Sequence, residues 1–137
     1  MMKYLTGVVE IFGIVYLRFT ILPRVWCVWL VAVNSACIFF IQHVEAQLVL
    51  GVTLLAVLLQ GVIYQRTGFT RIMGAVHLAW IPMFIWMAGR IDVISQNKEL
   101  SVWLVILLLT NFISLLIDGI DMTRYVKGER APHYSWK

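Results

Sequence analysis

Charged side chains are scarce in this chain. Only 13% of its 137 residues are Asp, Glu, Lys or Arg, against about 25% in soluble globular domains. Hydrophobic residues make up 61% of the chain, which is more apolar surface than a water-soluble domain of this length can bury. The composition therefore excludes an ordinary soluble domain.

Cysteine and the common catalytic motifs are also scarce. Cys27 and Cys37 are the two cysteines, and their spacing on a helix is about 15 Å, too far for a disulfide. The sequence contains no Cys/His metal cluster, Gly-rich phosphate loop, catalytic triad or dinucleotide fingerprint. It therefore predicts no metal, no cofactor and no catalytic residue, and it favours a protein that is not an enzyme.

The basic residues do not form a nucleic-acid-binding patch. The formal net charge is +4, but Lys and Arg lie between hydrophobic blocks and near the C-terminus, with no contiguous run. This distribution is typical of charges that orient a protein in a membrane. The predicted partner is thus a lipid bilayer, and nucleic acid is excluded.

Four long stretches carry no formal charge. Crossing the hydrocarbon core of a bilayer takes roughly 17–25 apolar residues on a helix. The sequence predicts an all-α integral membrane protein, a single membrane domain over residues 1–137 whose core is a four-transmembrane-helix bundle. The predicted spanning helices are 25–42, 46–64, 72–89 and 100–117, followed by a polar tail over 122–137.

The first 22 residues are apolar on one side and polar on the other. Lys3, Glu10 and Arg18 share one arc of a helical wheel. This pattern predicts an N-terminal amphipathic helix over 1–22 that lies along the membrane surface. A fifth spanning helix is the alternative. Pro23 is expected to end or kink this element.

The distribution of Lys and Arg predicts the orientation. With both termini and the 65–71 loop on one side, that side holds nine of the 11 basic residues. Basic residues are enriched in cytoplasmic loops, so we expect both termini to be cytoplasmic. The charge asymmetry and short loops favour a bacterial inner membrane.

A stripe of polar residues runs along the last hydrophobic stretch. Its members recur at spacings of 3, 4, 3 and 4 residues, which places them on one helix face. They are Asn111, Ser114, Asp118, Asp121 and Tyr125, here called the polar seam. A seam in a spanning helix must turn away from lipid. Asn34 and Ser35 lie at a similar depth and are candidate partners for its deeper members.

His77 is predicted to lie at a depth that permits contact with Asp118. One interpretation is a carboxylate and imidazole pair that passes protons or couples to an ion. The other is structural, with the seam carboxylates bound by arginines at the membrane interface. The candidate arginines are Arg18, Arg66, Arg71 and Arg124.

Three function hypotheses follow. The first is a non-catalytic accessory, scaffold or immunity-type component that packs against a membrane-protein partner, or against itself, through the polar seam and a basic cytoplasmic face. That face comprises Arg66, Arg71, Arg124, Lys127 and Arg130. The second is a small oligomeric transporter or channel that uses Asp118 and His77 for proton or ion coupling. The third is a membrane enzyme acting on lipid.

Overall fold

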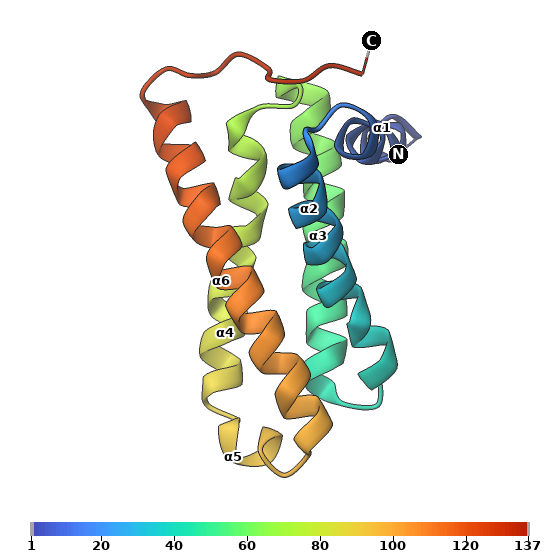
Figure 1. The fold of residues 1–137 in the computed structure, drawn as a ribbon, viewed down its shortest axis with the longest axis vertical. Helices are drawn as coiled ribbons and strands as arrows, with labels where there is room; N and C mark the ends of the chain where they lie inside the picture. The colour runs from blue at the N-terminus through green and yellow to red at the C-terminus, as the bar shows by residue number, and fades with distance from the viewer. Residues whose placement is uncertain (1, 137) are drawn as a thin grey trace.

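Four apolar helical segments run along the long axis of the molecule (Figure 1). The structure is a computed structural model that describes residues 2–136. Its helices in chain order are α1 (Met2–Leu17), α2 (Ile21–Ser35), η1 (Ala36–Phe40), α3 (Val44–Thr67), η2 (Arg71–Ala79), α4 (Trp80–Ala88), α5 (Ile91–Ile94) and α6 (Lys98–Val126). The segments long and apolar enough to cross a membrane are Ile21–Phe40, Val44–Thr67, Arg71–Ala88 and Lys98–Val126. The prediction of an all-helical bundle with four such segments is confirmed.

The last helix is longer than predicted. The apolar stretch 100–117 suggested its bounds, but α6 covers Lys98–Val126, so the first residues of the predicted 122–137 tail are helical. Asn97 caps the start of α6, where its side chain accepts a hydrogen bond of 3.0 Å from the backbone of Leu100. Helix hydrogen bonds do not require apolar side chains, so α6 continues into polar sequence. The whole polar seam therefore lies on one helix. Met1 and Lys137, at the ends of the predicted segments, lie outside the described residues.

Helix α1 lies across one end of the bundle, with its axis roughly perpendicular to the four long segments (Figure 1). Both ends of the described chain lie at this end too, which we call the tail end. With 16 residues, α1 is about 24 Å long, shorter than a bilayer core. Its orientation is the one that a surface helix requires, and its location at a membrane surface stays a prediction.

The connection between α1 and α2 differs from the prediction. The first helix ends at Leu17, and Pro23 neither ends nor kinks it. Pro23 instead occupies the first turn of α2, where a missing backbone N–H breaks no helix hydrogen bond. Small residues hold α1 against α3, since a β-carbon on Gly61 would lie 2.8 Å from the Tyr4 carbonyl oxygen.

The third of the four long apolar segments changes its winding halfway. It forms a 3-10 helix over Arg71–Ala79 and an α-helix over Trp80–Ala88. Pro82 lies in the first turn of the α-helical part, and without an N–H it cannot bond the carbonyl four residues earlier. The change of winding decides which side chains of η2 face α6.

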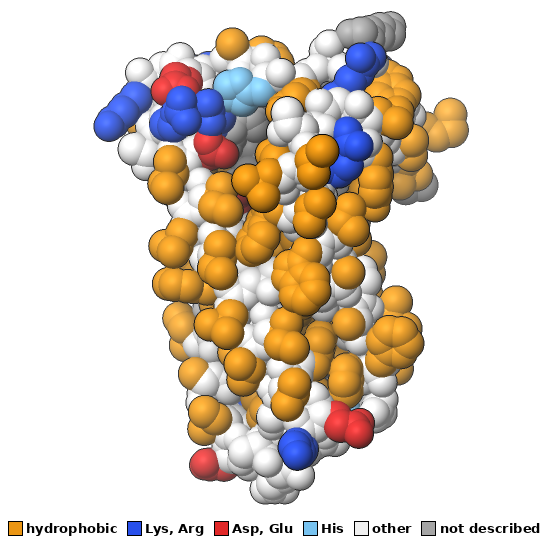
Figure 2. Space-filling view, viewed as in Figure 1, with side chains coloured by type: hydrophobic (Ala, Val, Ile, Leu, Met, Phe, Trp, Pro, Cys, Tyr) orange, Lys and Arg blue, Asp and Glu red, His pale blue; other side chains and the backbone are white. Residues whose placement is uncertain are grey.

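The apolar core fills the half of the bundle away from the tail end. We call the opposite end, which carries α5, the hairpin end. The buried core includes Cys37, Val49, Met83, Trp103, Leu104 and Leu107. Figure 2 shows hydrophobic side chains along the length of the visible face and charged ones gathered at its two ends. This distribution is compatible with a bundle whose middle contacts lipid.

The C-terminal tail, residues 127–136, crosses over the tail end of the bundle (Figure 1). The backbone N–H of His133 donates to the Phe69 carbonyl at 3.0 Å. The Tyr134 ring lies against the rings of Phe19 and Phe69, with centroid distances of 4.8 and 5.7 Å. The tail is therefore packed onto the loop before η2 and the connection between α1 and α2.

Candidate functional site

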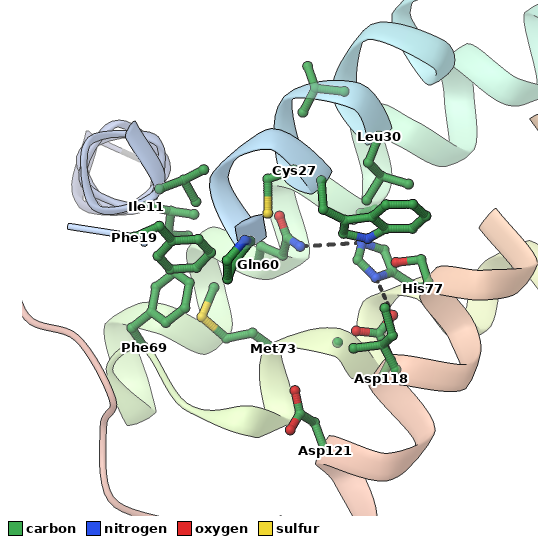
Figure 3. Close-up of a pocket in the computed structure, with 18 of the residues that line it drawn as sticks. Ile11, Phe19, Cys27, Leu30, Gln60, Phe69, Met73, His77, Asp118 and Asp121 are labelled. Carbon is green, nitrogen blue, oxygen red and sulfur yellow. Dashed lines mark hydrogen bonds and ion pairs between the residues drawn. The ribbon is translucent and has the colours of Figure 1, made fainter. Parts of the chain in front are cut away.

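A histidine and an aspartate from two of the long apolar segments are in direct contact. Nδ1 of His77, on η2, lies 2.7 Å from Oδ2 of Asp118, on α6 (Figure 3). Their side chains are 13% and 15% exposed, so both are largely removed from solvent. The predicted contact between the Asp118 carboxylate and the His77 imidazole is thus present, and its role in passing protons stays a prediction.

The 3-10 winding of η2 brings this pair together. In a 3-10 helix, residues three apart lie one above the other. Arg71, Gly74 and His77 therefore form one ridge, and Trp80 continues it at the start of α4. The ridge faces the polar seam of α6. Gly74 lies so close to the Asp118 carboxylate that a β-carbon at position 74 would overlap it.

His77 has two further contacts besides Asp118. Its Nε2 lies 3.5 Å from Nε2 of Gln60, an amide nitrogen that can only donate. If Gln60 donates to Nε2, the proton of a neutral ring is on Nδ1, the nitrogen that faces Asp118. Trp80 stacks on the ring, with centroids 4.1 Å apart and planes 10° apart. Three helical segments thus hold the imidazole in place.

Asp121, one turn beyond Asp118, is bound by an arginine. Arg71 forms an ion pair with Asp121, and its Nε lies 3.2 Å from Oε2 of Glu129 in the tail. Arg124 holds the same glutamate, with its Nε 3.0 Å from both carboxylate oxygens. The structural interpretation therefore describes Asp121, and Arg71 joins η2, α6 and the tail.

Charged partners hold the Glu129 carboxylate in its ionised form. The hydrogen bond from Arg124 lowers the pKa of Glu129 below its ordinary value of 4.5, and the charges of Arg124 and Arg71 add to this effect. The same contact raises the pKa of Arg124. The tail is therefore anchored by ionic contacts that need an ionised Glu129.

A cavity of about 790 Å³ lies in the tail half of the bundle, bordered by Arg71, His77, Asp118 and Asp121. Helices α1, α2, α3, η2 and α6 and the tail all contribute to its wall. Most of the wall is apolar, including Ile11, Phe19, Leu30, Phe69 and Met73, while Gln60, His77, Asp118 and Asp121 supply polar groups (Figure 3). Ligand sites for small molecules have this size and this mixture of lining groups.

The deeper residues of the polar seam are buried within the chain. Asn111 and Asn34 exchange two hydrogen bonds, of 2.8 and 3.0 Å, and their side chains are almost completely buried. The pairing expected between Asn34 and the seam is thus present. Ser114 is also buried and borders the cavity. Ser35, the other candidate partner, is exposed.

The remaining predicted residues do not join the cavity. Tyr125 is half-buried at the end of α6, where the Arg130 guanidinium lies 5.5 Å from its ring centroid. The other basic residues of the predicted face, Arg66, Arg124 and Lys127, are exposed. Of that face, only Arg71 reaches the site.

Sequence reasoning missed three residues of the site, namely Gln60, Gly74 and Trp80. A three-residue spacing from Arg71 to Trp80 is visible in the sequence, but it indicates a shared face only if the segment is a 3-10 helix. It also missed an ion pair at the hairpin end. There, buried Glu45 accepts a 2.9 Å hydrogen bond from Arg90, which lies over the Trp86 ring.

Within residues 2–136, no three His, Cys, Asp or Glu side chains are grouped so as to hold a metal ion. No known family model, curated protein or solved structure matches this chain. Any functional assignment therefore rests on the geometry of the site.

Proposed function

We propose that this protein is a small membrane transporter in which the His77–Asp118 pair passes protons across the membrane, also without substrate, and couples them to substrate movement when substrate is bound. The observation that carries the proposal is the 2.7 Å contact between the two side chains at the wall of a 790 Å³ cavity. Ionisable groups within spanning segments are costly, and in membrane proteins they commonly mark ion and proton pathways. Histidine is the side chain best suited to gaining and losing a proton near neutral pH.

The packing of the bundle supports a cavity that is accessible from one side of the membrane at a time. The cavity occupies the tail half, while packed residues such as Leu104 and Leu107 fill the hairpin half. Transport would then need the hairpin half to open, or a second copy to complete the path, because transporters expose a site to each side in turn. A bacterial inner membrane with both termini in the cytoplasm is part of the proposal. The excess of basic residues at the tail end supports it.

The experiment is a proton-flux measurement on the purified chain in liposomes that contain a pH-sensitive dye. Under an imposed membrane potential, wild-type liposomes should change internal pH several times faster than protein-free ones. Asp118→Asn should reduce the rate to the protein-free level, because the amide cannot exchange a proton at neutral pH. Asp92→Asn alters an exposed carboxylate at the hairpin end and should leave the rate unchanged. Wild-type flux at the protein-free level, or full flux in Asp118→Asn, would reject the proposal.

Docking onto a membrane-protein partner is a second candidate function. The deeper part of the polar seam is a poor docking surface, since Asn111 and Ser114 are buried within the chain. The exposed basic side chains at the tail end favour a docking surface there instead, comprising Arg66, Arg124, Lys127 and Arg130. An acidic segment of a partner would fit this surface.

No observation favours a lipid-processing enzyme. The two seam carboxylates that such an enzyme would use, Asp118 and Asp121, are engaged by His77 and Arg71.

A further inference from the structure

We infer that the cavity binds an amphiphilic organic cation. This inference names the substrate class of the proposed transporter and so rests on that proposal. The first observation is the charge of the wall. Among the lining residues, one arginine, Arg71, stands against two aspartates, Asp118 and Asp121. With neutral histidines, the net charge of the wall is −1.

The negative charge belongs to Asp118. The charge of Arg71 is already offset, because its guanidinium contacts both Asp121 and Glu129. Asp118 contacts the neutral His77 ring through Oδ2, while its other oxygen, Oδ1, lies against Gly74, so no cationic side chain is seen to offset this carboxylate among residues 2–136. An ionised carboxylate at the wall of an apolar cavity attracts a cation and disfavours an anion.

The wall also suits a cation that carries hydrocarbon. Aromatic side chains attract cations through their ring faces, and methionine sulfur is polarizable and adapts to varied shapes. The cavity wall includes Met73 and the aromatic residues Phe12, Tyr16, Phe19, Trp26, Phe69, Trp80 and Tyr134.

A metal ion fits this wall less well than an organic cation. Metal ions need several oxygen, nitrogen or sulfur ligands to replace their water. The part of the chain that the structure describes offers no group of three such ionisable ligands. An organic cation spreads its charge over a large surface and loses less hydration when it enters an apolar cavity.

The test uses tetraphenylphosphonium, a permanent organic cation, and tetraphenylborate, an anion of matched size and shape. Each is titrated into the full chain in phosphatidylcholine nanodiscs, and binding is followed by calorimetry against empty nanodiscs. We expect saturable binding of the cation with one site per chain and binding of the anion at least tenfold weaker. Asp118→Asn should weaken cation binding at least tenfold, while Asp92→Asn should not change it. Equal binding of the two ions, or wild-type affinity in a folded Asp118→Asn, would overturn the inference.

A second measurement leaves Asp118 intact, in case Asp118→Asn does not fold. Cys27 lines the cavity, and Cys37 is buried in the hairpin half. In a Cys37→Ser background, a trimethylammonium methanethiosulfonate should modify Cys27 faster than the sulfonate reagent of similar length. Tetraphenylphosphonium should slow that reaction. Faster reaction with the anionic reagent, or no protection by the cation, would overturn the inference.

These measurements separate the inference from the transport proposal. Cation binding without proton flux in liposomes would support the inference and reject transport. Flux that depends on Asp118 without binding of tetraphenylphosphonium would support transport and reject an organic cation as the substrate class.

Discussion

Gly74 and Asp118 lie in contact, with the carboxylate of the aspartate occupying the space where a side chain at position 74 would be. This contact lets η2 and α6 approach closely enough for the same carboxylate to reach His77. The absence of a β-carbon at one position therefore determines the geometry of the proposed proton site.

Gly74→Ala should push η2 away from α6 and break the contact between His77 and Asp118. Overpacking of this kind costs roughly 1–3 kcal/mol, which thermal unfolding in detergent would detect, and proton flux should fall with it. Gly119→Ala is the matched control, since its β-carbon meets no atom within 4 Å. On helix propensity alone, that control should stabilise α6 by about 0.5–1 kcal/mol. Equal effects of the two substitutions would contradict the role assigned to Gly74.

Asn111→Ala should destabilise the bundle because it leaves the buried amide of Asn34 without its partner. We expect a loss of roughly 1–2 kcal/mol in the free energy of unfolding. Combining Asn34→Ala with Asn111→Ala should cost less than the sum of the single changes. Ser35→Ala, at an exposed neighbouring position, serves as the control. Strict additivity in this double-mutant cycle would show that the two amides do not stabilise each other.

The tail should detach from the bundle in acid. The pKa of Glu129 is lowered in the folded chain, so its ionic contacts stabilise the docked tail at pH values above the ordinary 4.5. That stabilisation is lost as the pH falls below 4.5 through the lower folded pKa. Hydrogen exchange of residues 128–136 should therefore be slow at pH 7 and, after correction for the intrinsic rate, less protected at pH 3.

Glu129→Gln should reduce protection of the tail at pH 7, because the amide removes the charge that Arg71 and Arg124 contact. Glu99→Gln changes an exposed glutamate at the start of α6 and should have no such effect. Full protection in Glu129→Gln would mean that the aromatic contacts of Tyr134 alone hold the tail.

Charge reversal at Arg124, Lys127 and Arg130 tests the docking candidate. If an acidic partner binds the exposed basic side chains, the triple Glu variant should release a protein that co-purifies with the wild type from native membranes. Lys98→Glu, near the hairpin end, should retain it. A wild-type chain that purifies alone in mild detergent would count against docking.

The hydropathy of the sequence determined the four long helices, because each uncharged block must be helical to satisfy its backbone groups and must lie among other apolar groups. The 3.6-residue period of the last hydrophobic stretch likewise placed Asn111, Ser114, Asp118 and Asp121 on one helix face. Local sequence could not show that Lys98–Val126 is one continuous helix or that Pro23 lies in the first turn of α2, since both depend on how the neighbouring segments pack.

Only the tertiary structure decided which partner each seam carboxylate has. Arg71 and His77 were both within reach of the seam by depth alone. Their assignment to Asp121 and Asp118 depends on the 3-10 winding of η2, which aligns residues three apart and turns Gly74 toward α6. The choice of a 3-10 helix over an α-helix reflects packing between helices, and the hydrophobic periodicity of the sequence does not predict it. Arg71, His77, Asp118 and Asp121 were therefore visible in the sequence as candidates. Their pairing, and the part played by Gln60, Gly74 and Trp80, were properties of the folded bundle.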